Sequence, residues 1–74
     1  MKKRDRLPEA VHIWLDIPSA EERGLDEYYS ISIVDGDGEE IRCAGGSASV
    51  AAALRIGRDT ANDLGLELIS VERA

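Results

Sequence analysis

The tetrapeptide Asp35-Gly36-Asp37-Gly38 constrains the fold of this chain more than any other feature of its sequence. Asp-Gly pairs tolerate the positive φ angles of tight hairpin turns. The turn lies between two segments rich in β-forming residues, at 27–34 and 39–44. The sequence therefore predicts a β-hairpin over residues 28–44, and Gly45-Gly46 is expected to end its second strand.

A further strand is predicted upstream, over residues 10–17. Apolar residues alternate there with His12, Trp14 and Asp16, and a period of two is typical of a half-buried strand. Pro18 is expected to end this strand. Ser19 and Glu22 have the spacing of a capping box, which favours one helical turn that Gly24 would stop.

A helix is predicted after the hairpin, with Ser47 or Ser49 as its N-cap. Its apolar stripe follows steps of four and three residues and ends before Gly65, a natural C-terminal cap. The stripe consists of Val50, Leu54, Gly57, Ala61 and Leu64. Residues 66–72 are apolar enough to form a fourth strand.

The order of elements is thus β-β-β-α-β. We expect a small α+β fold with a mostly antiparallel four-stranded sheet and one helix packed on one face. Residues 1–8 are expected to form a flexible basic N-terminus, and residues 9–74 a single domain. A right-handed crossover would make strands three and four parallel, with strand four beside either strand one or strand three.

One helix covers only one face of such a sheet, so the other face is a candidate interface. The helix is expected to cover Val11, Ile13, Leu15, Tyr29, Ile31, Ile33, Ile41 and Cys43. The open face would present His12, Trp14, Asp16, Tyr28, Ser30, Ser32 and Arg42, together with Val34. Aromatic residues are enriched in protein interfaces, which favours a protein-binding role for this face.

Motifs for cofactors, metals and catalysis are weak. One cysteine, Cys43, and one histidine, His12, give neither an intrachain disulfide nor enough His/Cys zinc ligands. The acidic turn does not match an EF-hand, and the glycines before the helix lack the lysine of a P-loop. Strand alternation places Cys43 and His12 on opposite faces, so we predict no cofactor, no metal and no enzyme.

Charge narrows the class of partner. The net charge is −6, and residues 24–74 carry four basic and ten acidic side chains. Such a surface disfavours direct binding to nucleic acid, because affinity for phosphate comes mainly from Lys and Arg. No apolar run is long enough to cross a bilayer, and the start of the chain is a poor secretory signal, so we expect a cytoplasmic protein.

The leading hypothesis is a non-catalytic protein-interaction or regulatory module that uses the open sheet face or a sheet edge. Its partner would be another protein or a second copy, giving a homodimer. An alternative is an acidic regulator or inhibitor, a nucleic-acid mimic or antitoxin-like, that binds a basic partner. A small enzyme using Cys43 or His12 ranks last. The order of elements over residues 28–72 resembles HicB-type antitoxin domains and other short bacterial β-β-α-β proteins, but order alone assigns no family.

Overall fold

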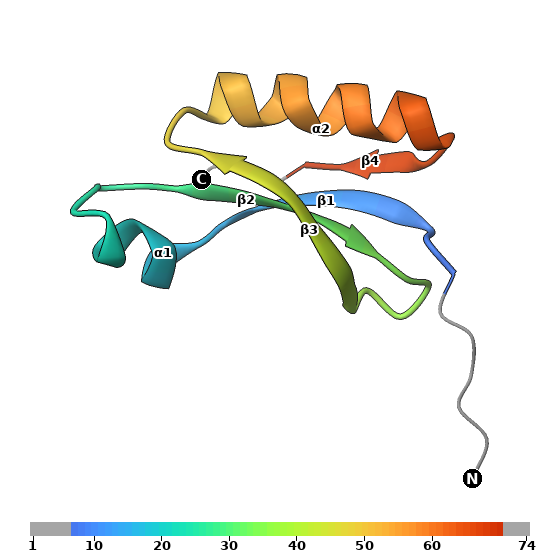
Figure 1. Cartoon of the computed structure of the whole chain (residues 1–74), viewed down its shortest axis with the longest axis horizontal. Coiled ribbons are helices and arrows are strands. Elements are labelled where there is room, and N and C mark those ends of the chain that lie inside the picture. The colour runs from blue at the N-terminus through green and yellow to red at the C-terminus, as the bar shows by residue number, and fades with distance from the viewer. Residues whose placement is uncertain (1–6, 71–74) are drawn as a thin grey trace, which may run out of the picture.

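A computed structural model describes residues 7–70 of the chain (Figure 1). Its elements are β1 (Ala10–Leu15), α1 (Ile17–Glu22), β2 (Tyr29–Val34), β3 (Glu40–Ser47), α2 (Val50–Leu64) and β4 (Glu67–Ile69). The strand order in the sheet is β3-β2-β1-β4. Pairing is antiparallel between β1 and β2 and between β2 and β3, and parallel between β1 and β4. The predicted α+β fold is confirmed, with a mixed sheet.

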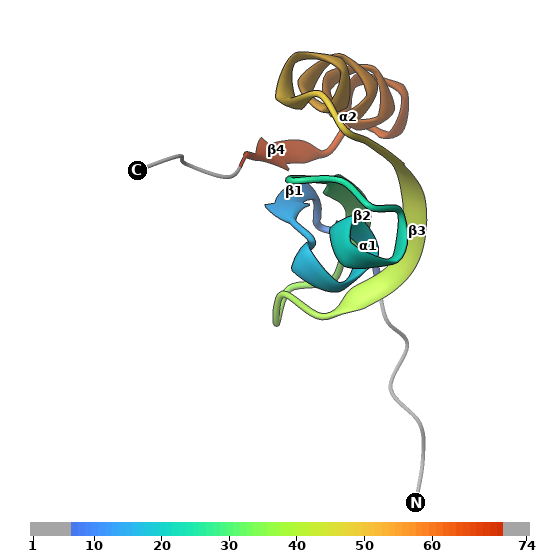
Figure 2. The same cartoon turned by 90° about the vertical axis from the view of Figure 1, so that its left-hand side faces the viewer.

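The fourth strand lies beside the first, which the sequence left open. Because β1 and β3 run in the same direction, β4 is also parallel to β3, as predicted. Figure 2 shows β3 and β4 at opposite edges of the twisted sheet, with α2 on one side and α1 on the other.

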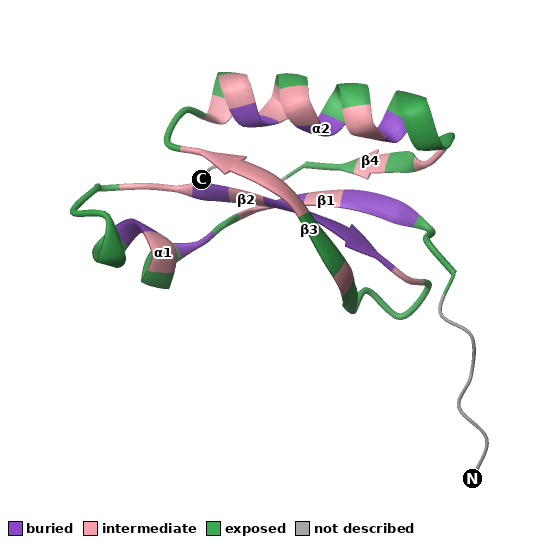
Figure 3. Ribbon diagram, viewed as in Figure 1, coloured by how far each residue is buried: buried purple, intermediate pink, exposed green. Residues whose placement is uncertain are grey.

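The core lies between α2 and the facing side of the sheet (Figure 3). It contains Val11, Ile13, Tyr29, Ile31, Ile33, Ala53 and Ala61. Gly57 lets the helix approach closely, because a Cβ there would lie 2.7 Å from Ile13 Cδ1 and 3.2 Å from Leu68 Cδ1. The inward faces predicted for the first two strands are confirmed, except that Leu15, the last residue of β1, remains 41% exposed.

The two ends of α2 follow local chemistry. Ser49, one of the two predicted caps, accepts a hydrogen bond from the Ala52 backbone N–H at 3.3 Å. Gly65 adopts a left-handed φ of 68° after the last helical residue. Both ends of the predicted helix are confirmed.

The predicted capping box at Ser19 is wrong. Asp16 is the N-cap of α1, and its side chain accepts a hydrogen bond from the Ser19 backbone N–H. Pro18 therefore lies in the first turn of α1, where a backbone N–H has no helical partner, instead of ending a strand. For the same reason β1 ends at Leu15 and does not extend to Ile17.

The end predicted for the third strand is also wrong, because β3 continues through Gly45 and Gly46 to Ser47. These glycines stay paired with β2, opposite Ile31 and Ser30. Gly46 leaves room for Tyr28, whose hydroxyl oxygen would lie 2.5 Å from a Cβ at this position.

Two register shifts in the β2–β3 ladder overturn the predicted faces of Arg42 and Cys43. The extra residues at these shifts are Ile41 and Ala44. After the first shift, Arg42 pairs with Ile33 of the core face and Cys43 pairs with Ser32 of the open face. The two residues therefore exchange the faces that strict alternation predicted, because one inserted residue reverses every side chain that follows it.

Some predictions fall on parts of the chain that are not described. Most of the predicted basic segment, at residues 1–6, and the last residues of the predicted fourth strand, at 71–72, lie outside the described residues. Within residues 7–70, neither helix has the length and apolar character needed to traverse a bilayer.

Candidate functional site

The ladder register brings most of the predicted interface residues together on the face away from α2, which we continue to call the open face, although Asp16, Ser32 and Val34 on it are buried, contrary to the prediction. One row across the sheet contains His12, Ser32 and Cys43, with Ile69 beside His12 on β4. The next row contains Trp14, Ser30 and Gly46, and the backbone N–H of Asp16 bonds to the Tyr28 carbonyl beyond it. Arg42 is the one predicted interface residue that the register places in the other face.

A chain of side-chain hydrogen bonds crosses this face from β1 to β3. Trp14 Nε1 donates to Ser32 Oγ at 3.0 Å, and Ser32 Oγ donates to Glu40 Oε1 at 2.6 Å. Ser32 is only 2% exposed. The indole N–H and the hydroxyl are therefore engaged within the molecule.

Asp16 is held in a second polar contact at the end of β1. Ser30 Oγ donates to Asp16 Oδ2 at 2.6 Å, and the Ser19 backbone N–H donates to Oδ1 at 3.2 Å. The Ser30 hydroxyl is the main cause of a lowered pKa for the Asp16 carboxyl, and partial burial opposes it. Both carboxylate oxygens of Asp16 thus accept hydrogen bonds within the fold.

Tyr28 is half-buried over Gly46, and it is covered from the other side by Arg23. The Arg23 guanidinium carbon lies 4.2 Å from the centre of the Tyr28 ring, a cation–π arrangement. Both aromatic residues that the sequence singled out are therefore packed against neighbours in the folded chain.

His12 and Cys43 face the same side of the sheet, contrary to the prediction. They lie on strands separated by β2, so their backbones are about 10 Å apart. That separation is too large for a hydrogen-bonded nucleophile and base. Among residues 7–70 there is no cluster of three or more His, Cys, Asp or Glu side chains that could hold a metal ion.

Large exposed apolar side chains are unevenly distributed. The described part of the chain has six of them, Leu7, Leu15, Ile17, Leu25, Leu64 and Ile69. None lies on β2 or β3. Ile69 lies on β4, in the open face beside His12, Leu15 ends the strand that β4 pairs with, and Leu64 ends α2 just before β4. We call the sheet edge at β4, with these three residues, the β4 side. The sequence predicted a sheet edge as a possible interface but singled out none of these residues.

The backbone of β4 is also open at this edge. The bond from Asp16 N–H to the Tyr28 carbonyl shows that even-numbered residues of β1 direct their backbone groups to β2. Val11 therefore directs its groups to β4, where it lies opposite Leu68. By alternation, Leu68 directs both its N–H and its C=O away from β1, toward the open edge.

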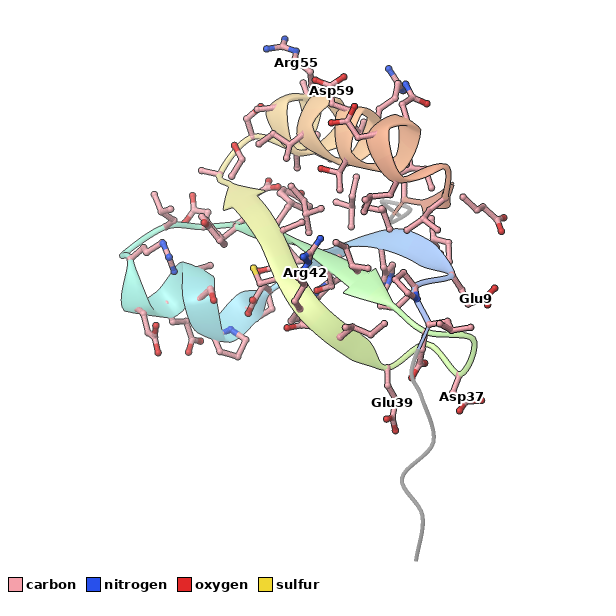
Figure 4. All side chains as sticks on the ribbon, turned by 45° about the vertical axis from the view of Figure 1, so that its right-hand side comes forward. Glu9, Asp37, Glu39, Arg42, Arg55 and Asp59 are labelled. Atoms are coloured by element: carbon pink, nitrogen blue, oxygen red, sulfur yellow. The ribbon has the colours of Figure 1, made fainter. Side chains whose placement is uncertain are left out.

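Acidic side chains dominate the rest of the described surface. Residues 7–70 contain four arginines and thirteen Asp or Glu residues, a net charge of −9. Glu9, Asp37 and Glu39 project near the hairpin end, and Arg55 and Asp59 project from the outer side of α2 (Figure 4).

No protein-family model, curated protein or solved structure matches the chain. Its function must therefore be inferred from its own residues.

Proposed function

We propose that this chain is a non-catalytic protein-interaction module that binds its partner through the β4 side of the sheet. One observation carries the proposal: of the six large exposed apolar side chains among residues 7–70, none lies on β2 or β3 and three lie on β4 and its neighbours. Apolar surface beside an open strand edge is the combination used when a partner adds a strand to a sheet.

The edge at β4 is a better binding surface than the centre of the open face. The polar groups of Trp14, Ser32 and Asp16 are already bonded to neighbours, so a partner would have to replace these bonds. Among residues 7–70, the N–H and C=O of Leu68 point away from β1, at the edge of the sheet where no described strand follows.

Comparative capture tests the proposal. Wild-type chain and the variants Ile69→Glu, Leu25→Glu and Trp14→Ala are used as baits, and bound proteins are quantified by mass spectrometry. Leu25 is a matched control because it is 40% exposed, close to the 43% of Ile69, and lies in a loop. We expect Ile69→Glu alone to lose the partner. Loss with Trp14→Ala and retention with Ile69→Glu would instead assign binding to the open face.

A second candidate function is an acidic regulator or inhibitor that binds a basic protein. The net charge of −9 over residues 7–70 supports it. Binding of this kind should weaken steeply as salt rises, and salt-insensitive binding would contradict it. A cytoplasmic location is part of both proposals, because an unpaired cysteine suits a reducing compartment.

A further inference from the structure

We infer that the partner at the β4 edge is a second copy of the chain, joined about a two-fold axis so that the two β4 strands pair antiparallel. The inference rests on the proposed function, because it names the partner of the same surface. It would make one continuous sheet from two copies, with both α2 helices on one face.

The backbone of β4 is complementary to itself. Leu68 presents a donor and an acceptor on the same edge, so a two-fold axis beside it lets each copy donate to the other. In this register Glu67 of one copy lies opposite Ile69 of the other. The two Glu67 carboxylates are therefore not paired directly, which avoids repulsion between like charges.

The exposed side chains on this side suit burial by the second copy. Ile69 is 43% exposed and Leu64 is 44% exposed. Leu68 packs beneath α2 near Gly57, so extending the sheet at β4 places the two helix layers side by side on the same face.

The available area fits a weak dimer. β4 has three residues, so the strand edge is about 10 Å long and about 5 Å wide, and α2 above it is about 22 Å long and about 10 Å across. Together they project an area of less than about 300 Å². The smallest stable interfaces take about 600 Å² from each partner. We therefore expect reversible association.

Charge makes the inference distinguishable from binding to a basic protein. Each copy carries a net charge of −6, so two copies repel and salt screens that repulsion. Self-association should therefore strengthen as salt rises, the opposite of the behaviour of an acidic regulator.

Sedimentation equilibrium of the full chain tests the inference over a concentration series at low and high salt. As concentration rises, the weight-average mass should increase from 8.0 kDa toward twice that value. At a given concentration it should be closer to the mass of the dimer at high salt than at low salt. Ile69→Glu places a second carboxylate opposite Glu67 and should raise the dissociation constant at least about tenfold. Ile69→Lys places an opposite charge there and should raise it less than about threefold.

Two further variants complete the test. Leu25→Glu makes the same change of charge away from the edge and should change the dissociation constant by less than about twofold. Ser70→Pro removes the N–H expected to follow Leu68 on the open edge, and it should weaken association without moving a core side chain. Circular dichroism confirms that each variant is folded.

Three results would overturn the inference. A monomeric mass at every concentration contradicts it, and an Ile69-dependent capture of a different protein would then leave the proposed function standing. Equal effects of Ile69→Glu and Ile69→Lys contradict the two-fold register. A dimer lost in Trp14→Ala and kept in Ile69→Glu contradicts both the inference and the choice of the β4 side.

Discussion

The two edge strands of the sheet, β3 and β4, differ in how far they are protected against pairing with another strand. β3 carries two register shifts, the exposed charged residues Glu40 and Arg42, and a pair of glycines. These are devices by which sheet proteins prevent unwanted pairing at an edge. β4 has two such devices, its short length of three paired residues and the exposed charge of Glu67, but it has no register shift and it exposes Ile69.

This difference in protection favours β4 over β3 as the edge available for binding. β3 is long enough to pair with another strand, yet its irregular backbone and its charges oppose this. β4 is regular over its described length, and its outward backbone groups lie beside apolar side chains.

The packing that holds β4 under α2 should be the most sensitive. Gly57→Val would drive side-chain atoms into Ile13 and Leu68, and we expect it to lower the free energy of unfolding by about 2–3 kcal/mol. Urea denaturation measures the change. Ala51→Val is the control, because Ala51 is an exposed position of the same helix and should cost only about 0.5 kcal/mol. Equal costs for both variants would show that β4 is not held by this contact.

The attachment of β3 to β2 should depend on Ser32. Ser32→Ala removes the donor to Glu40 and the acceptor for Trp14, so we expect a loss of about 1–2 kcal/mol of unfolding free energy. Ser70→Ala, at an exposed serine next to β4, should change it by less than about 0.5 kcal/mol. A neutral Ser32→Ala would mean that the hydrogen-bonded chain across the open face adds nothing to stability.

The carboxyl group of Asp16 should make the free energy of unfolding depend on pH. The folded pKa of Asp16 lies below the ordinary value of 3.8, so its ionised carboxyl stabilises the fold above that pH. This contribution is lost as pH falls through the folded pKa. Asp16→Ala should cost about 1 kcal/mol at neutral pH, because α1 loses its N-cap.

Acid titration of unfolding separates the charge of Asp16 from its capping role. Asp16→Asn keeps an oxygen that caps α1, and its stability should fall less steeply than that of the wild type below pH 3.8. Identical acid profiles for the two proteins would contradict the assigned role of the carboxylate.

The smallest effect is expected at the β3 edge. Arg42→Ile makes that edge more apolar but leaves both register shifts in place, so unfolding free energy should change by less than about 0.5 kcal/mol. The double variant with Arg42→Ile and Ile69→Glu should be monomeric in sedimentation equilibrium. Dimer formation by this double variant would show that charge, and not the irregular backbone, keeps β3 from pairing.

Local chemistry made much of the fold predictable. The Asp-Gly turn, the helical stripe with Ser49 and Gly65 at its ends, and the alternation in β1 and β2 each depend on residues close in the chain. They identified the hairpin, the helix and the β-β-β-α-β order, and they placed Trp14 and Ser32 in one face.

What could not be predicted depends on contacts between distant residues. The shift at Ala44 adjoins Gly45, and a glycine inside a strand often marks a bulge, but a glycine pair equally favours the end of a strand. No residue type marks the shift at Ile41 in the sequence. The hydrogen bonds from Trp14 through Ser32 to Glu40 require that register. The exposure of Ile69 depends on β4 being the edge strand beside β1, a strand order that the sequence left open.

Whether β4 is the edge that pairs with another strand can be measured by amide hydrogen exchange at Leu68, followed by NMR across a concentration series. If β4 is the edge that pairs, the Leu68 N–H should exchange rapidly in dilute protein and become protected as concentration rises, while the β3 amides stay unchanged. Leu68 exchange that is independent of concentration, or protection that appears along β3 instead, would contradict the assignment of binding to β4.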